Sequence, residues 1–373
     1  MKKKLFLLDA YALIYRAHFA FIKNPRINYN GLNTSAIFGF CNSLLEVINN
    51  HQPTHLAVVF DPPGGSQREE VFLDYKANRQ EMPEDIRKSI PYIFDILKAM
   101  NIPFKMEDGF EADDLIGTLA KQAEKKDYQV YMMTPDKDFG QLVSENIFIY
   151  KPGRGGNPSE ILGPKEVCEK FEVERPEQVI DILGLWGDAV DNIPGIPGIG
   201  EKTAKKLIGI YGSIENLLAN TADLKGKQKE NVENFAEQGL ISKQLATIIL
   251  DSPVTFDELE FERKEIDEKE ITKILKELEF NQLGKRILGK PIYQEKQMDL
   301  FAENEIESDS EPSFQTFSST KPSYQLIEKR DDHIELIRKL LSQEAVAFDT
   351  ETTSLDINEA KLLGISFCFS KNE

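Results

Sequence analysis

Acidic residues follow several apolar, strand-like stretches of the sequence. Asp9 ends KKLFLLD, Asp61 ends AVVFD, and Asp136 and Asp138 follow the apolar run in VYMMTPDKD. In sheets built from parallel strands, the carboxyl ends of the strands face the ligand crevice. We therefore expect carboxylates from distant parts of the chain to meet at one edge of a sheet.

Two further segments add acids to this set. GFEADDLIGTLA places acids in the first turn of an expected helix, and GDAVDN carries aspartates ahead of a glycine-rich turn. Any single acid of this kind can be a helix N-cap, or a first-turn residue that favours the helix dipole. The candidate metal ligands are Asp9, Asp61, Glu111, Asp113, Asp114, Asp136, Asp138, Asp188 and Asp191.

Gathering the whole set in one place requires cations. Like charges about 4 Å apart repel by roughly 4 kcal/mol per pair at an effective dielectric constant near 20. Oxygen ligands without His or Cys favour Mg²⁺ or Mn²⁺ over zinc. Two such ions, about 3.5–4 Å apart, form the usual clamp for phosphodiester hydrolysis. The pattern therefore predicts a carboxylate-rich nuclease site. A phosphatase with Asp9 as its nucleophile is less favoured, because LLDAYA lacks the second nearby Asp of that chemistry.

Basic and aromatic side chains lie between these acids, in SQREEVFLDYKANRQ. Arg68, Tyr75, Lys76 and Arg79 recur at spacings of about one or two helical turns. Such a segment is commonly a solvated helix face with i,i+4 ion pairs. Between metal ligands, the same cations can hold phosphates while Tyr75 stacks on a base.

The segment GIPGIGEKTAKK combines a glycine turn with a basic helix start. Its backbone amides can approach a phosphate closely, and this form is a helix-hairpin-helix, which binds DNA backbone without reading sequence. A purely structural glycine turn is the alternative. Because Asp188 and Asp191 directly precede it, metal and duplex would be held at a fixed distance from each other. The expected DNA contacts here are Gly195, Gly198, Gly200, Lys202, Thr203 and Lys205.

The elements that must position these residues alternate between strands and helices. KKLFLL, HLAVVF and YQVYMM are strand-like, while residues 35–50 and 86–100 show helical periodicity. We expect an α/β fold over residues 1–175, with a mostly parallel central sheet flanked by helices. A helical subdomain that contains the helix-hairpin-helix is expected over residues 176–290.

The remainder of the chain has a different composition. Residues 291–325 are rich in Glu, Ser, Gln and Pro, which predicts an acidic flexible linker. Residues 326–373 alternate helix and strand patterns but are too few for an independent core. We therefore expect the truncated start of a second α/β domain.

Bulk composition excludes several classes of protein. A formal charge of −18 and a pI near 4.9 argue against a generic nucleic-acid coat but leave room for local basic patches. The cysteines are few and far apart, which favours a reducing cytosol and no cysteine metal cage. Asp9 and Arg16 interrupt the signal-like N-terminus, and no apolar run reaches the roughly 20 residues that span a bilayer. We expect a cytoplasmic monomer without membrane association.

Taken together, the motifs of residues 1–290 resemble one known family, in order along the chain. They are FLLDAYALIYRAHFA, VVFD, YKANR, GFEADDLIGTLA, TPDKDFGQLV, GDAVDNIPGIPGIGEKTA and SKQLATI. This family is the N-terminal 5′-nuclease domain of bacterial DNA polymerase I, related to flap endonucleases and PIN-like in fold. The resemblance implies a metal-dependent 5′→3′ exonuclease and 5′-flap endonuclease that acts on nicked or flapped DNA in primer removal, replication and repair.

The resemblance also implies roles by position. Lys76 and Arg79 match the basic pair that contacts the scissile phosphate, while Tyr15 and Arg16 lie on a helix near the DNA. The glycine hairpin holds duplex and, in relatives, also a monovalent cation. The ligands of one divalent ion would be Asp9, Asp61, Glu111 and Asp113, and those of the second Asp136, Asp138 and Asp191, with Asp188 and Asp114 in support.

Two motifs lie beyond the nuclease region. AFDTETTSLD resembles the first motif of a 3′→5′ proofreading domain, with Asp349 and Glu351 as its metal pair, although a short acid pair after a strand is common. The other acids of that domain would lie beyond Glu373, so we expect neither proofreading nor polymerisation. QMDLF, from Gln297 to Phe301, resembles the pentapeptide that docks replication enzymes on the sliding clamp; the alternative is a chance string.

The competing function is a non-catalytic DNA-binding module that uses the hairpin alone. In such a module the acids would serve as helix caps and solubilising charge. A binding module gains nothing from negative charge beside a phosphate backbone, whereas a metal-dependent nuclease requires it. The completeness of the acidic set therefore favours the nuclease.

Overall fold

The computed structural model describes residues 2–153, 158–292, 325–327, 329–343, 345–353 and 361–369. The chain divides into two units, Met1–Lys296 and Gln297–Glu373. The QMDLF motif lies outside the described residues, as does all but the ends of the predicted linker at 291–325.

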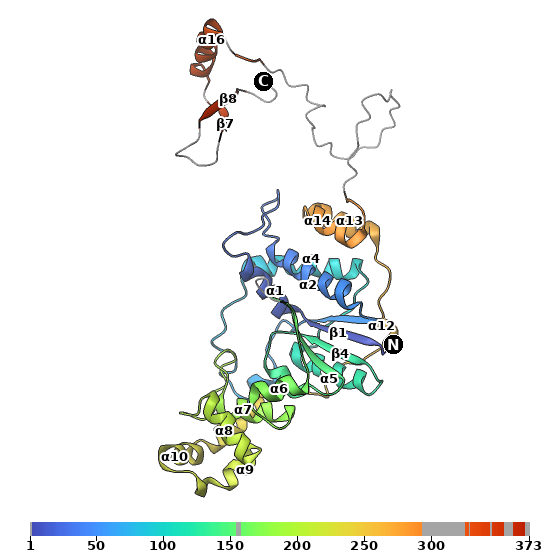
Figure 1. Cartoon of the computed structure of the whole chain (residues 1–373), viewed down its shortest axis with the longest axis vertical. Helices are drawn as coiled ribbons and strands as arrows, with labels where there is room; N and C mark the ends of the chain where they lie inside the picture. The colour runs from blue at the N-terminus through green and yellow to red at the C-terminus, as the bar shows by residue number, and fades with distance from the viewer. Residues whose placement is uncertain are drawn as a thin grey trace. The chain divides into compact units, whose positions relative to one another are not determined.

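A sheet forms the centre of the first unit (Figure 1), and it has six strands in the order β3-β2-β1-β4-β5-β6. Every neighbouring pair is parallel except β5 and β6, which confirms the expected α/β fold with a mostly parallel sheet. Asp9 pairs with Val59, and Leu8 pairs with Met133, so the carboxyl ends of the central strands lie level. The strands are β1 (Lys4–Asp9), β2 (His55–Val59), β3 (Phe104–Lys105), β4 (Gln129–Met133), β5 (Ile147–Lys151) and β6 (Glu160–Leu162).

Side-chain alternation along β1 divides the apolar core between the two faces of the sheet. Leu5 and Leu7 pack on one face with the helix α5, whereas Phe6 and Leu8 pack on the other with α1, α2 and α4. Burial of these faces removes apolar surface from water and holds the strands in register. The helices are α1 (Ala10–Ala20), α2 (Ser35–His51), α4 (Glu84–Ala99) and α5 (Ala112–Glu124).

Helices dominate the chain after β6. The hairpin of α7 and α8 lies beside α9 (Figure 1), and α11 packs against α7. After α12 (Glu258–Phe261), however, the chain returns to the sheet, and α13 (Glu268–Glu277) and α14 (Asn281–Leu288) pack beside α4 and α2. The helices of the hairpin region are α6 (Pro164–Phe171), α7 (Val179–Trp186), α8 (Glu201–Tyr211), α9 (Ile214–Ala219), α10 (Gly226–Asn234) and α11 (Ala236–Ala246).

The packing of α13 and α14 beside α4 and α2 differs from the prediction of one helical subdomain over residues 176–290. Ile271, Leu275 and Leu283 are buried in the same cluster as Phe40 and Ile93, because α13 and α14 cover apolar positions of α2 and α4. The last part of that range therefore belongs to the α/β layer and not to the hairpin region.

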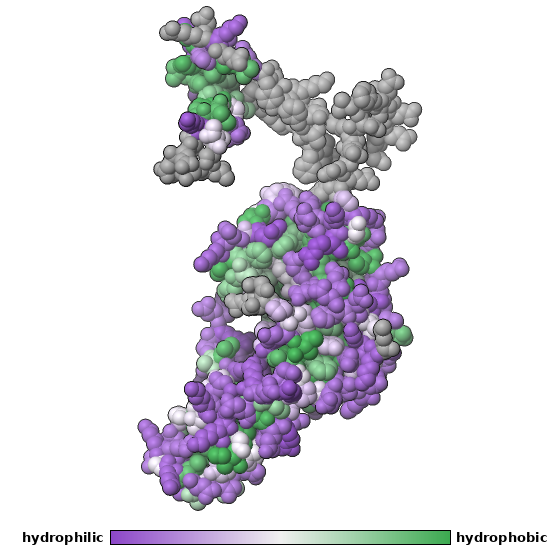
Figure 2. Space-filling view, viewed as in Figure 1, coloured by the Kyte–Doolittle hydropathy of each residue, from purple (hydrophilic) through white to green (hydrophobic). Residues whose placement is uncertain are grey.

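The second unit contains α16 (Arg330–Leu341) and an antiparallel pair of strands, β7 (Ala347–Thr352) and β8 (Leu362–Cys368). Asp349 and Glu351 are both exposed on β7. On the first unit, polar residues cover most of the face in view (Figure 2). Across the described ranges, every helix is too short or too polar to cross a membrane.

Candidate active site at the carboxyl edge of the sheet

Asp9 connects the ends of β1 and β4. Its Oδ1 accepts a hydrogen bond from the Ala12 amide at 3.1 Å, so Asp9 is the N-cap of α1. Its Oδ2 accepts one from the Thr134 hydroxyl, also at 3.1 Å, and the same hydroxyl accepts from the Asp136 amide at 3.2 Å. Thr134, which sequence reasoning missed, thus ties together the acids after two neighbouring strands.

The start of α5 is held to the end of β2 in a similar way. Asp61 Oδ1 accepts a hydrogen bond from the Ala112 amide at 2.9 Å. Glu111 is the N-cap residue of α5, and Asp113 lies in its first turn. The acids of GFEADDLIGTLA are therefore brought next to the acid that follows β2.

Electrostatic coupling shows that acids from separate segments lie near one another. Burial, followed by the charges of Asp61 and Asp136, raises the pKa of Asp9 to about 7. Burial is also the main cause of a raised pKa at Asp136, to which Asp191 and Asp188 contribute. Clustered, desolvated carboxylates of this kind are typical of functional sites.

Asp138 adds an unsatisfied oxygen to this group. Its Oδ1 is buried without a hydrogen-bond partner among the described residues, and its pKa is raised well above the usual range by burial and by Asp136. Buried polar atoms normally have a partner, and hard divalent cations take carboxylate oxygens as ligands. The donor set and this oxygen fit a divalent metal ion.

Basic side chains form ion pairs with several of the acids that a metal ion would bind. Lys76 Nζ lies 2.7 Å from Glu111 Oε2, and Arg79 Nη2 lies 2.5 Å from Asp191 Oδ1. Lys137, which sequence reasoning also missed although it stands between two acids in PDKD, pairs with Asp188. With acids turned toward these cations, the described part of the chain holds no group of three or more His, Cys, Asp or Glu side chains placed to bind an ion.

Hydrogen bonds connect the basic segment around Lys76 to the loop that precedes the glycine hairpin. The Lys76 amide donates to the Asp191 carbonyl at 3.0 Å, and the Asn78 side chain donates to the Ala189 carbonyl at 2.7 Å. In return, the Asn192 side chain donates to the Asp74 carbonyl at 2.6 Å. Residues 73–78 form turns, so the helical spacing expected there is wrong, but Lys76 and Arg79 do reach the acids.

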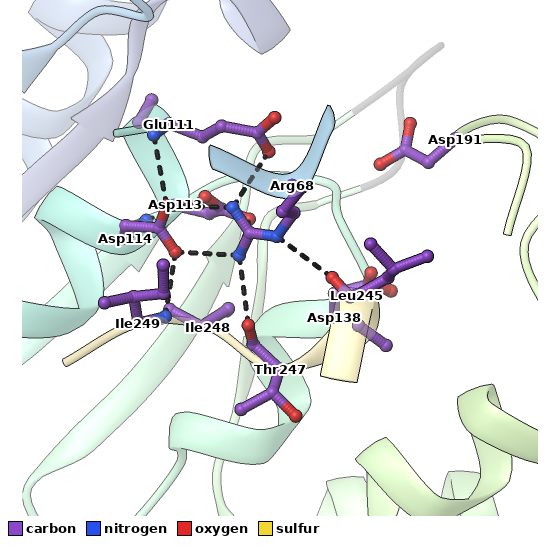
Figure 3. A network of polar contacts seen from close by, with 12 residues as sticks. Arg68, Glu111, Asp113, Asp114, Asp138, Asp191, Leu245, Thr247, Ile248 and Ile249 are labelled. Atoms are coloured by element: carbon purple, nitrogen blue, oxygen red, sulfur yellow. Dashed lines mark hydrogen bonds and ion pairs between the residues drawn. The ribbon is translucent and has the colours of Figure 1, made fainter. Parts of the chain in front are cut away.

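Arg68 is an internal link and not a DNA contact. Its guanidinium makes a fork with Asp114, at 2.8 Å on both arms, and also lies 3.3 Å from Glu111 Oε2 (Figure 3). Its remaining donors go to the carbonyls of Leu245 and Thr247, both at 3.0 Å. Since arginine has five N–H donors and only 5% of Arg68 is exposed, none is left for a phosphate, which corrects the predicted role.

Asp114, which was expected in support of the ligands, and Tyr75, which was expected to stack on a base, are also held inside the protein. Asp114 is 0% exposed, and besides Arg68 its oxygens accept from the Ile249 amide at 2.8 Å and the Glu111 amide at 3.1 Å. It therefore supports its neighbours instead of facing an ion. Tyr75 is 5% exposed and donates its hydroxyl to Glu111 at 3.1 Å, so its ring cannot stack on a base.

Glu111 and Asp113 respond differently to this cluster. Burial alone would raise the pKa of Glu111, but Lys76 and Arg68 outweigh it and hold that pKa below its usual value. Burial raises the pKa of Asp113 well above its usual value despite Arg68, with help from Asp114 and Glu111. The pKa values of two acids at one helix start are therefore shifted in opposite directions.

The glycine turn contains one buried and two exposed glycines. Gly195 is buried at φ +60°, and a Cβ there would lie 2.5 Å from the Gly187 nitrogen. Its amide donates to Ser242 Oγ at 3.0 Å, so it is unavailable to a phosphate, contrary to expectation. Gly198 and Gly200 are exposed, and a Cβ on Gly200 would meet nothing within 4 Å.

The lysines and the threonine of α8 also differ from one another. Lys202 is exposed and Thr203 is half-buried near the helix start. Lys205 pairs with Glu201 at 2.9 Å and donates to the Lys170 carbonyl at 2.8 Å, so the structure does not support a phosphate contact by this side chain. Of the two lysines predicted to touch DNA, Lys202 is the accessible one.

On α1, Tyr15 and Arg16 lie beyond the Asp9 cap. Tyr15 is half-buried and packs edge-on against Tyr11, with ring centroids 6.5 Å apart. Arg16 donates to the Gly153 carbonyl, which ties α1 to the segment after β5. A DNA contact by either residue stays a prediction.

Family models match most of the first unit. The model described as 5′-3′ exonuclease, N-terminal resolvase-like domain, matches residues 4–172. The model described as 5′-3′ exonuclease, C-terminal SAM fold, matches residues 174–269. With the acidic sheet edge, these matches define a nuclease enzyme.

A relative of similar length specifies the family. The 5′-3′ exonuclease of Aquifex aeolicus (strain VF5) is 37% identical over 299 residues, which cover 80% of this chain and 100% of that protein. The chain belongs to the 5′-3′ exonuclease family.

Longer relatives carry the name DNA polymerase I. The one from Bacillus subtilis (strain 168) is 39% identical over 288 residues, covering 77% of this chain and 32% of that protein. The one from Pseudomonas aeruginosa is 34% identical over 378 residues, covering 99% of this chain and 39% of that protein. The chain thus spans about a third of the length of these relatives.

Solved structures share the fold at low sequence identity. T5 5′-exonuclease with bound divalent metal ions (zinc) matches with a TM-score of 0.56 and 19% identity, over 77% of this chain and 99% of that one. The catalytic core of Rad2 in complex with DNA substrate matches with a TM-score of 0.51 and 18% identity, over 78% and 90%. The architecture of the first unit is therefore that of 5′-nucleases.

Proposed function

We propose that this chain is a Mg²⁺- or Mn²⁺-dependent 5′→3′ exonuclease and 5′-flap endonuclease on DNA. We further propose that it is the N-terminal part of a DNA polymerase I that acts in primer removal, replication and repair, in the cytoplasm and as a monomer. The observation that carries the nuclease proposal is the set of buried, mutually repelling acids at the ends of β1, β2 and β4. The relatives named DNA polymerase I and the neighbours with metal ions or DNA support it.

The acids divide into two groups by position. The group nearer α5 would hold one ion and the group nearer the hairpin loop a second, with Asp188 in support. When bound, two divalent ions supply Lewis acids that activate water and neutralise charge on the phosphodiester. The proposed ligands of the first ion are Asp9, Asp61, Glu111 and Asp113, and those of the second are Asp136, Asp138 and Asp191.

The basic residues exchange partners in this proposal. Lys76 and Arg79 neutralise Glu111 and Asp191 in the structure. With those carboxylates bound to divalent ions, both side chains would be free to hold the scissile phosphate. The open turn at Gly198 and Gly200, with Lys202, would hold the duplex backbone, where a monovalent cation can assist.

The nuclease proposal is tested with a flapped DNA duplex and the purified chain. We expect cleavage near the flap junction with Mg²⁺ or Mn²⁺, and none with EDTA. Cleavage that persists in EDTA would reject the metal mechanism. Binding of the duplex without cleavage under any divalent ion would instead support the non-catalytic module.

Two peripheral proposals are tested separately. We expect Leu300→Ala with Phe301→Ala to abolish binding to a sliding clamp, and unchanged binding would reject the QMDLF motif. We also expect no nucleotide incorporation and no 3′→5′ degradation by the 373-residue chain. Detecting either activity would contradict this expectation.

A further inference from the structure

The end of α11 and the residues directly after it are held by side chains of the α/β part at five consecutive positions. Residues 245–249 place their backbone groups against Arg68, Gln141 and Asp114, which belong to α3 (Gln67–Val71), the 3₁₀ turn Asp138–Leu142 and α5. The contacts are Leu245 O to Arg68 Nε at 3.0 Å, Ala246 O to Gln141 Nε2 at 2.9 Å, Thr247 O to Arg68 Nη2 at 3.0 Å, Ile248 N to Gln141 Oε1 at 3.0 Å, and Ile249 N to Asp114 Oδ1 at 2.8 Å.

These anchoring residues also touch the proposed metal ligands. Arg68 lies 3.3 Å from Glu111 Oε2, and Gln141 donates to the Asp138 carbonyl at 2.9 Å. Figure 3 shows Arg68 between the acids of α5 and the 245–249 segment. The end of α11 is thus fixed to both groups of acids.

The body of α11 is fixed to the glycine hairpin. Ser242 is 0% exposed and accepts from the Gly195 amide at 3.0 Å, while Gln238 donates to the Gly195 carbonyl at 2.7 Å. Close packing adds to these bonds, since a Cβ on Gly239 would lie 2.9 Å from Ile196 Cδ1. Both the amide and the carbonyl of Gly195 therefore form hydrogen bonds with side chains of α11.

Because α11 is anchored near both ends, its length fixes the distance between the two sites that anchor it. Seven residues separate Gln238 from Leu245, which corresponds to a rise of about 10 Å along an α-helix. The hydrogen bonds at both attachments are buried or part-buried, so sliding α11 by a fraction of a turn would leave several of these polar groups unpaired.

We propose that α11 is a spacer that sets the distance between the DNA-holding hairpin and the acidic site, and so determines the nucleotide at which the strand is cut. Arg68, Gln141 and Ser242 are positioning residues in this scheme, because they act through the backbone of α11 and Gly195. The inference rests on the proposed nuclease function and adds to it the residues that select the cutting position.

The test measures product lengths at single-nucleotide resolution on a flapped duplex with Mg²⁺, under single-turnover conditions. Gln141→Leu removes the hydrogen bonds that hold the end of α11 near the acidic site, and Ser242→Ala removes the hydrogen bond that holds α11 to Gly195. We expect either change to raise the share of product cut at neighbouring positions about threefold, because displacements near 1 Å already disturb reacting geometry. The double variant should add little beyond either single change, because both loosen one element.

The matched control is Leu275→Ala, which opens the core under α13 and touches neither attachment. It should lower the melting temperature and the amount of active protein but leave the cutting position unchanged. If Gln141→Leu does not fold, Arg68→Lys, which keeps the charge and loses the fork, replaces it. Wild-type product lengths in both end variants would overturn the inference while leaving the nuclease intact. Absence of cleavage by the wild-type chain would overturn the proposed function, and the inference with it.

Discussion

The central sheet has different charge arrangements at its two edges: at the amino edge acids pair with cations at the surface, whereas at the carboxyl edge the cations leave buried acids such as Asp9 and Asp138 beside other acids. Before β1 and β4, Lys3 lies 2.8 Å from Glu258, and Tyr128 donates to the same carboxylate at 2.7 Å. The hydrogen bond from Lys3 is the main cause that lowers the pKa of Glu258 to about 2. At the other edge, burial and neighbouring acids raise the pKa of Asp9 to about 7.

The difference separates a structural arrangement from a binding site. Opposite charges at a surface need no further partner and contribute modestly to stability. Buried like charges oppose folding, and their presence indicates a site whose charge is balanced by something that binds. Substitutions at the amino edge can therefore serve as controls for substitutions at the carboxyl edge.

Removing an acid from the carboxyl edge should have the largest effect. We expect Asp138→Ala to slow cleavage about 1,000-fold, roughly 4 kcal/mol of barrier, because a metal ligand is lost. Flap binding should change little, since the hairpin is untouched. Single-turnover cleavage and a binding titration measure the two effects.

Glu258→Gln at the amino edge is the control for this change. It should lower the melting temperature slightly and leave the cleavage rate as it was. A comparable loss of rate in both variants would show that the two edges do not differ in the way we infer.

The pH dependence of stability should also distinguish the edges. The pKa of Asp9 is raised in the folded state from 3.8 to about 7, so the folded chain keeps a proton that the unfolded chain releases. Without divalent ions, the free energy of unfolding should fall by about 4 kcal/mol as pH rises from about 4 to about 7. Urea denaturation at stepped pH measures this, and Asp9→Asn should flatten the slope.

Glu258 should behave in the opposite direction. Because its folded pKa is lowered, its contribution is present at neutral pH and is lost only as pH falls toward 2. Stability that increases between pH 4 and 7 in wild type, and equally in Asp9→Asn, would contradict the assignment of Asp9.

Removing a cation from the acidic edge should have an intermediate effect. We expect Lys76→Ala or Arg79→Ala to slow single-turnover cleavage about 30-fold, roughly 2 kcal/mol, through a weaker hold on the phosphate. Lys3→Ala removes a cation from the amino edge and should leave the rate unchanged. Normal cleavage by either carboxyl-edge variant would show that its role is assigned wrongly.

The smallest effect extends the comparison to α8, where an exposed lysine lies near a paired one. Lys202→Ala should weaken duplex affinity about threefold and reduce the salt slope of binding by about 1, whatever the DNA sequence. Lys205→Ala, which removes the partner of Glu201, should change neither quantity. A larger salt effect from Lys205 would place the DNA on the other side of α8.

The sequence was sufficient for the central strands and for the acids at their ends. Apolar runs in β1, β2 and β4 are long enough to show as patterns, and an acid stands at the end of each strand or within about three residues after it. The strands β3, β5 and β6 were missed; β3 and β6 have only two or three residues, which carry no periodicity.

The partners of individual side chains could not be predicted in the same way. Arg68 looks like a DNA-binding residue in a basic segment, yet it bonds to carbonyls 177 and 179 positions away. Gly195 looks like a phosphate-binding glycine, but Ser242 occupies its amide. Such contacts depend on how distant segments pack, which neither composition nor spacing encodes locally.

The late return of α13 and α14 to the α/β layer has a consequence for synthesis on the ribosome. Ile271, Leu275 and Leu278 complete the apolar cluster that α2 and α4 begin. Domains generally fold as units while the chain emerges at about 5–20 residues per second. A nascent chain that has not reached α14 therefore exposes the apolar side of α2 and α4 for roughly 10 to 40 seconds, and this is the stage at which we expect chaperones to bind it.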